Sequence, residues 1–122
     1  MNFRDLKVWQ KSKNLAIEIY QLTDKGKIAH DFGLRDQIRR AAVSICSNIA
    51  EGDERGTNKD SVRFLYMAKG SSAELLTQLE ISVGVGYFTQ DQVRMVNSEI
   101  IDIGKMLGSL IKARTTTKGT GS

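Results

Sequence analysis

The last third of the chain carries an apolar pattern that only a packed helix satisfies. Between Thr89 and Ala113 the apolar side chains alternate at spacings of three and four residues. Side chains at those spacings share one narrow stripe of an α-helix, and such a stripe must be buried against partner helices. Thr89 and Gln92 form a T-x-x-Q capping box at the start of this segment. The stripe consists of Val93, Val96, Ile100, Ile103, Leu107 and Leu110.

Three earlier segments carry weaker helical patterns of the same kind. They predict helices over residues 4–24, 32–50 and 57–85, separated by polar stretches that contain glycine. Asn2, Asp31 and Thr57 are expected to cap them, because their side-chain oxygens accept hydrogen bonds from the backbone of a first helical turn. The expected core stripes are Val8, Leu15, Ile19 and Leu22; Leu34, Ile38, Ala41, Ile45 and Ile49; and Val62, Leu65, Ser72, Leu76, Leu79 and Val83.

The four patterns together define the expected fold class. No segment alternates as a β-strand does, and the 122 residues contain no proline that would interrupt a long helix. The prediction is an all-α domain, an antiparallel up-down-up-down four-helix bundle over residues 1–113. Residues 114–122 are polar and are expected to form a disordered tail.

Two of the predicted helices carry apolar residues on the side opposite their core stripe. A lone bundle needs one apolar stripe per helix, so a second one is typical of a surface that is buried by self-association. The alternative is the scattered apolar surface residues that most proteins have. The pattern favours a homo-oligomer whose interface contains Arg39, Val43, Cys46, Ala50, Met67, Ile81 and Val85.

The chain is mildly basic, and its cations form two candidate stripes. Lys and Arg number 18 against 14 Asp and Glu, which gives a net charge of +4. Helical spacing places Arg4, Lys7 and Lys11 on one face of the first helix, and Lys105 with Lys112 on one face of the fourth. Such stripes can contact the phosphates of RNA or DNA. The alternative is a solvated helix face that binds nothing.

The sequence predicts no catalytic site. His30 is the one histidine and Cys46 the one cysteine. If the residues between them are helical, the two lie about 24 Å apart at about 1.5 Å per residue, too far for a dyad. No ligand spacing predicts a metal site, and no phosphate-binding loop is present. In the loop at Glu51–Arg55 a pair between these two residues is expected, rather than a cation site. We therefore expect a protein that is not an enzyme, with no cofactor, no metal and no small-molecule substrate.

The expected compartment is the cytoplasm. A single cysteine cannot form a disulfide within the chain, which suits a reducing environment. The first ten residues are charged and lack the apolar centre of a signal peptide, and no segment is long and apolar enough for a membrane span.

The stretch from Arg39 to Gly52 predicts close packing of helices. Most of its residues are alanine, serine or other small side chains that let neighbouring helices approach. Arg40 is expected to pair with Asp36 one turn earlier. Asn48 needs a hydrogen-bond partner if it is buried, and Gly52 is expected to stop the helix.

Five stretches of the sequence together resemble a known family. They are "FRDLKVWQKS" at Phe3–Ser12, "YQLT" at Tyr20–Thr23, "FGLRDQIRRAAVSICSNIAEG" at Phe32–Gly52, "RFLYMAKGSSAELLTQL" at Arg63–Leu79 and "MLGSLI" at Met106–Ile111. Their combination resembles the bacterial four-helix-bundle proteins named for the 23S rRNA intervening sequence. It is also similar to the accessory variability proteins of diversity-generating retroelements, which are basic bundle oligomers.

The resemblance implies a ring-like homo-oligomer, with a pentamer favoured, and no enzymatic activity. It also implies a role connected with RNA, because the family is named for genes that lie in insertions within 23S rRNA genes. Two hypotheses follow. The first is a non-enzymatic oligomer that binds RNA or another nucleic acid through its basic faces. The second is a structural or protein-binding oligomer without affinity for nucleic acid.

Overall fold

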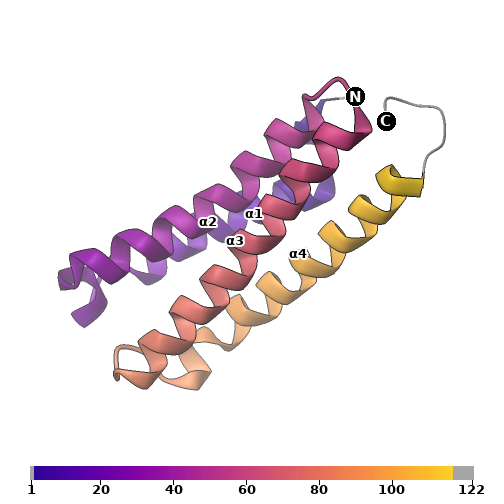
Figure 1. The fold of residues 1–122 in the computed structure, drawn as a ribbon. Helices are drawn as coiled ribbons and strands as arrows, with labels where there is room; N and C mark the ends of the chain where they lie inside the picture. The colour runs from indigo at the N-terminus through magenta and orange to yellow at the C-terminus, as the bar shows by residue number, and fades with distance from the viewer. Residues whose placement is uncertain (1, 117–122) are drawn as a thin grey trace.

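The computed structural model describes residues 2–116, and in that range the chain contains four α-helices and no strand (Figure 1). They are α1 (Lys7–Leu22), α2 (Phe32–Asp53), α3 (Asn58–Gly84) and α4 (Gln90–Thr116). Two short 3₁₀ turns, η1 (Phe3–Asp5) and η2 (Lys27–His30), precede α1 and α2. The predicted all-α class is confirmed.

Each helix packs against the next one in the chain, and α4 also packs against α1. The start of α1, the connection between α2 and α3 and the end of α4 all lie at one end of the bundle (Figure 1). The connections are short, as expected for helices that pack beside their neighbours in sequence.

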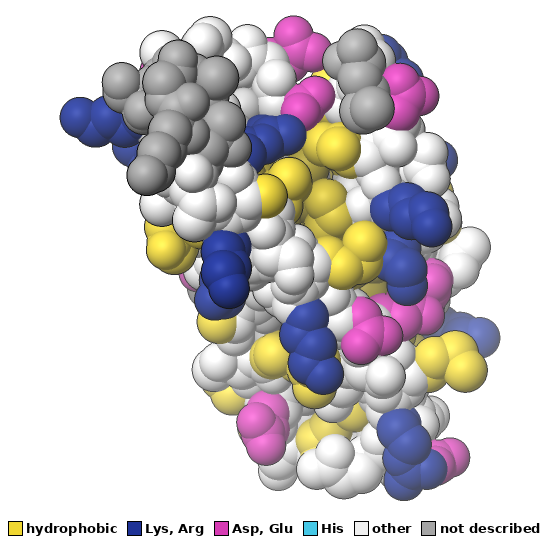
Figure 2. Space-filling model, turned by 90° about the vertical axis from the view of Figure 1, so that its right-hand side faces the viewer, with side chains coloured by type: hydrophobic (Ala, Val, Ile, Leu, Met, Phe, Trp, Pro, Cys, Tyr) yellow, Lys and Arg dark blue, Asp and Glu magenta, His cyan; other side chains and the backbone are white. Residues whose placement is uncertain are grey.

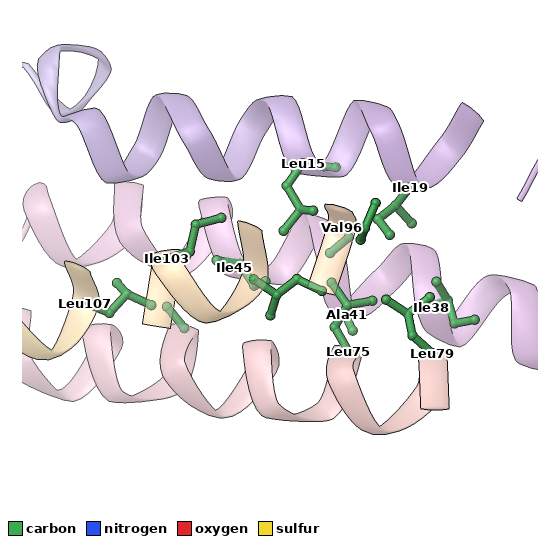
Figure 3. Packing of buried hydrophobic residues seen from close by; sticks show 14 of the residues in the cluster. Leu15, Ile19, Ile38, Ala41, Ile45, Leu75, Leu79, Val96, Ile103 and Leu107 are labelled. Atoms are coloured by element: carbon green, nitrogen blue, oxygen red, sulfur yellow. The ribbon is translucent and has the colours of Figure 1, made fainter. Parts of the chain in front are cut away.

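Side chains from all four helices meet in one core (Figure 3). Leu15 and Ile19 come from α1, and Ile38 and Ile45 from α2. On α4 the predicted stripe is buried from Val93 to Leu107. Its last predicted member, Leu110, is only partly buried, and Ile111 takes the final core position.

The core stripe of α3 differs from the predicted one. Leu65 and Leu79 are buried as expected, but Val62, Leu76 and Val83 lie at the edge of the core. The buried stripe instead runs at spacings of four and three through small and hydroxyl-bearing residues. Ser72 and Ser82 are accommodated on this stripe because their hydroxyls donate to carbonyls of their own helix, as Ser82 does to Gln78 at 3.0 Å. The buried residues are Ser61, Leu65, Ala68, Ser72, Leu75, Gln78, Leu79 and Ser82.

The two outer helix boundaries also differ from the prediction. Asn2 caps as expected, but it caps η1, because Leu6 takes an extended conformation (ψ 125°) that separates η1 from α1. At the other end α4 passes Ala113 and continues to Thr116. Residues 114–116 therefore belong to the helix, and the predicted tail over 117–122 lies outside the described residues.

Arg114, which the sequence places in the predicted tail, holds the end of α4 to the rest of the bundle. Its guanidinium donates to Asp53 at 2.8 Å and to the Ser61 hydroxyl. Asp53 ends α2 and Ser61 lies in the first turns of α3, so one side chain joins three helices. The ion pair is largely shielded from water, which makes it stronger than an ordinary surface pair.

Gly52 does not stop α2, which continues through it to Asp53. It is buried against α3, and a Cβ atom at this position would lie 3.0 Å from the Ser61 carbonyl oxygen and 3.2 Å from the Phe64 Cβ. Glycine is required here because the backbones of α2 and α3 come too close for a side chain.

The variant Gly52→Val is expected to lower the free energy of unfolding by about 1–3 kcal/mol, because the added atoms overpack the α2–α3 contact. Gly70→Ala is the matched control. Gly70 is exposed within α3 and has open space around it, so this change should stabilise the helix by about 0.5–1 kcal/mol. Urea denaturation followed by circular dichroism measures both, and a Gly52→Val protein as stable as the wild type would contradict the close approach.

Candidate nucleic-acid and self-association surfaces

The basic stripe predicted on the first helix is divided in the structure. Arg4 lies on η1, where it donates to the Asn2 side chain and stacks on the Phe3 ring at 4.8 Å. Lys7 and Lys11 lie on α1, beyond the break at Leu6. The three cations therefore do not lie on one continuous helix, so the prediction that they share one helix face is wrong.

Lys11 shares its surroundings with acidic side chains from two helices. It lines a hollow between α1 and α4 together with Glu18 and Glu99. The pKa of Glu99 is raised, mainly because the carboxyl is partly desolvated and further because Glu18 faces it; the charge of Lys11 opposes the shift. Two carboxyl groups beside one lysine leave little net positive charge for a phosphate.

The variant Glu99→Gln is expected to stabilise the protein at pH 7, because it removes the repulsion from Glu18. The folded chain holds the Glu99 proton more tightly than the unfolded chain does, so the wild type loses stability as pH rises through the folded pKa. The gain should be about 0.2–1 kcal/mol at pH 7, as for other partly exposed charge pairs. It should shrink at pH 4, where the wild-type carboxyl is protonated. Urea midpoints at the two pH values measure this, and a gain that grows at pH 4 would contradict the sign.

Lys7 borders an apolar hollow between the start of α1 and the end of α4. Leu6, Val8, Met106 and Leu110 line most of it. Figure 2 views the side of α4 and shows hydrophobic side chains exposed along the middle of this face, with Lys and Arg side chains on both sides. Lys7 thus stands beside apolar surface, separate from the carboxyl pair that Lys11 faces.

The two predicted basic residues of α4 have different surroundings. Lys105 lines a hollow with Arg94 and Asp102 and without any residue of α1. Arg94 is itself paired with Asp91 at 2.5 Å. Lys112 is exposed in the last turns of α4. Lys105 is therefore separate from the basic residues of α1, and acidic or apolar residues stand beside Lys7, Lys11 and Lys105.

The predicted apolar surface on α3 is exposed. Met67, Ile81 and Val85 leave 47%, 49% and 58% of their surface uncovered. Gln78, which the sequence places among them, is instead buried, and within residues 2–116 its Oε1 has no hydrogen-bond partner. Ser71 turns towards α2 and bonds to Ser44 at 2.9 Å. We refer to Met67, Ile81 and Val85 as the α3 patch.

The predicted interface residues of α2 lie on its α1 side. Arg39 donates to the Thr23 hydroxyl at 2.9 Å and stacks on the Tyr20 ring at 4.5 Å. Val43 is exposed in a hollow with Tyr20. The structure therefore gives Arg39 contacts within its own chain, which the sequence pattern did not indicate.

Cys46 and Ala50 are half-buried, so they offer less surface than the α3 patch does. Partial burial raises the pKa of the Cys46 thiol, and the thiol donates to the Val43 carbonyl.

His30 is exposed on η2. Within residues 2–116, no group of three or more His, Cys, Asp or Glu side chains is arranged to hold a metal ion. The same residues contain no helix that is both long and apolar enough to cross a membrane.

Three smaller predictions about the packing stretch and the loop have clear outcomes. Glu51 pairs with Arg55 at 2.9 Å, as expected. Asn48 finds its partners on Ser44, bonding to both the carbonyl and the hydroxyl oxygen. Asp36 pairs with the adjacent Arg35 at 3.0 Å in place of Arg40, so that prediction is wrong.

Cation–aromatic pairs are a feature that the sequence analysis missed. Lys13 lies over the Trp9 ring at 5.8 Å, and Arg35 stacks on Phe32 at 4.9 Å. Such pairs ordinarily occur about once per 70–80 residues, so this short chain is rich in them. The spacing of three or four residues within each pair is the signal in the sequence that would have revealed these two. The other cations over rings are Arg4, Arg39, Arg55 and Arg63.

Comparison with known proteins identifies a family and similar solved structures. The family model described as 23S rRNA-intervening sequence protein matches residues 4–109. A crystal structure of a protein of unknown function from the S23 ribosomal protein family of Bacteroides thetaiotaomicron is similar, with a TM-score of 0.78. The two sequences are 29% identical, and the match covers 86% of this chain and 98% of that one. No curated protein matches the chain.

Proposed function

Because this chain belongs to the family of 23S rRNA-intervening sequence proteins, we propose that it is a non-enzymatic, cytoplasmic scaffold that binds nucleic acid as a homo-oligomer. In this proposal the helices form an up-down-up-down bundle, and copies of the bundle assemble into a closed ring. A pentamer is favoured by the resemblance to the ring-forming bundles. The scaffold needs no cofactor and no small-molecule substrate.

The observation that supports self-association is the α3 patch. Two large apolar side chains of α3 and the valine that caps its end are about half exposed, although the bundle already has a complete core. Apolar surface that remains outside a finished core is typical of a protein interface. Methionine is also enriched at such interfaces relative to the rest of a protein surface.

Nucleic-acid binding is supported by charge. Each subunit carries a net charge of +4, and a ring would repeat that charge around its axis. Repetition raises the local positive potential and links several weak contacts into one stronger association. The structural alternative, an oligomer without affinity for nucleic acid, is favoured by one observation: carboxylates stand beside two of the predicted phosphate contacts, Lys11 and Lys105.

Binding of a fluorescently labelled RNA hairpin with single-stranded ends tests the two alternatives. Phosphate contacts release counterions, so the affinity should fall by more than about tenfold between about 50 and 200 mM salt. Fluorescence anisotropy at the two salt concentrations measures the fall. An oligomer that leaves the RNA unbound even at the lower salt concentration would favour the structural alternative.

A further inference from the structure

We infer that single-stranded nucleic acid binds across the outer face shared by α1 and α2, where Trp9 and Tyr20 lie beside Lys13, Arg39 and Arg40. This face, named here the α1–α2 face, differs from both basic stripes predicted from the sequence. The inference rests on the nucleic-acid binding proposed above and assigns it to a site.

The rings and cations of this face are held in fixed positions. Trp9, Lys13 and Tyr20 stand four and seven residues apart on α1, which places them on one side of the helix. Trp9 and Tyr20 are separated by about 16 Å along the helix axis at about 1.5 Å per residue. The Trp9 ring is braced by the edge of Phe3, with ring centroids 5.1 Å apart. A backbone carrying several stacked bases spans a distance of this order.

The Tyr20 end of the face is an open hollow of about 450 Å³. Tyr20 is 46% exposed and lines it with Arg39, Arg40 and Val43. The Arg39 guanidinium lies over the Tyr20 ring at 4.5 Å and also donates to the Thr23 hydroxyl. A planar guanidinium beside an exposed ring offers a stacking surface for a base and a donor for a phosphate.

Charge distinguishes this face from the predicted stripes. Within residues 2–116, no carboxylate forms an ion pair with Lys13, Arg39 or Arg40, and the one acidic residue of the hollow, Asp36, is bound by Arg35 at 3.0 Å. Lys11, by contrast, faces the carboxyl pair of Glu18 and Glu99. A polyanion is attracted by cations whose charge is not already neutralised, so the α1–α2 face is the better phosphate site.

The chain carries its own reporter at this face. Trp9 is the one tryptophan of the sequence, so the intrinsic tryptophan fluorescence comes from the proposed site. The unmodified protein is titrated into end-labelled oligouridine and oligothymidine of about 15 nucleotides and into an RNA duplex. Label anisotropy reports binding, and tryptophan emission reports contact with Trp9.

Single strands should raise the anisotropy and quench Trp9 with the same midpoint, and the duplex should bind more weakly. Binding without any change in Trp9 emission would overturn the inference and leave the proposed function intact. Absence of binding to every nucleic acid at low salt would overturn the proposed function itself. Equal affinity for duplex and single strands would overturn the stacking argument.

Two double variants with the same change in charge test the location. Lys13→Glu with Arg40→Glu should weaken oligouridine binding by about tenfold or more, whereas Lys7→Glu with Lys11→Glu should weaken it by less than about threefold. Circular dichroism shows whether each variant is folded. If the Lys13→Glu and Arg40→Glu double variant is unfolded, the double variant with Lys13→Gln and Arg40→Gln replaces it. The glutamine variant should lose affinity in the same direction but to a smaller extent. Equal losses for the two pairs, or a larger loss for the Lys7 and Lys11 pair, would overturn the assignment. Quenching of Trp9 by the oligonucleotide would also argue against burial of this face by a second copy of the chain. A Trp9 ring covered by a second copy would not be quenched by the oligonucleotide.

Discussion

The variant Ile81→Asp is expected to convert the proposed oligomer into monomers while each bundle stays folded. Ile81 lies on the α3 patch and is 49% exposed, so a carboxylate is solvated there in a free subunit. In an assembled ring the same carboxylate would be buried without a partner, and burying an unpaired charge costs several kcal/mol, which exceeds what one interface residue contributes. Light scattering should therefore give the mass of one chain, and circular dichroism should show unchanged helicity.

The control for this experiment is Ile101→Asp. Ile101 is an isoleucine on α4 that is 48% exposed, and it lines a hollow away from the α3 patch. The two variants change the same residue type at the same exposure, on two helices. We expect Ile101→Asp to keep the oligomer. Dissociation by both variants would show that added negative charge, and not the position, separates the subunits.

The second large effect is expected from Ile103→Ala, which removes a side chain in the middle of the core. Ile103 is 1% exposed and belongs to the α4 stripe (Figure 3). Deleting its buried methyl and methylene groups leaves a cavity that the neighbouring helices fill only in part, so the free energy of unfolding should fall by about 2–5 kcal/mol.

Urea denaturation at a fixed subunit concentration measures this loss. Ile101→Ala, two residues away on the exposed side of the same helix, should change stability by less than about 0.5 kcal/mol. A loss that small for Ile103→Ala would mean that this part of α4 does not face the core. A substantial loss for both would point to a general effect on the helix.

The sequence predicts the number of helices and the α4 core because large apolar residues mark every turn of that helix. It predicts α3 less well, since Ser61, Ala68 and Ser82 occupy core positions there. A search for large apolar side chains assigns these small residues to the surface, and the predicted core stripe of α3 therefore includes Val62 and Val83. Which residues are buried here is decided by how closely the helices approach each other. The same close approach explains why Gly52 is buried within α2 instead of ending it.

The candidate surfaces depend on contacts between residues that are distant in the chain. The exposure of Met67, Ile81 and Val85 follows from their positions on α3 and was predictable. The surroundings of Lys11 were not, because Glu99 reaches it from α4. Arg39 likewise meets Tyr20 and Thr23 across two helices, and no local pattern specifies which side chains of separate helices lie opposite each other.

We propose above all that the protein functions as an assembly of identical bundles. The most direct test is the mass of the unmodified protein by multi-angle light scattering over a range of concentrations. We expect one species whose mass is a fixed multiple of 13.6 kDa, about fivefold for the favoured pentamer, which persists on dilution as expected for a closed ring. A mass of 13.6 kDa at every concentration would contradict it.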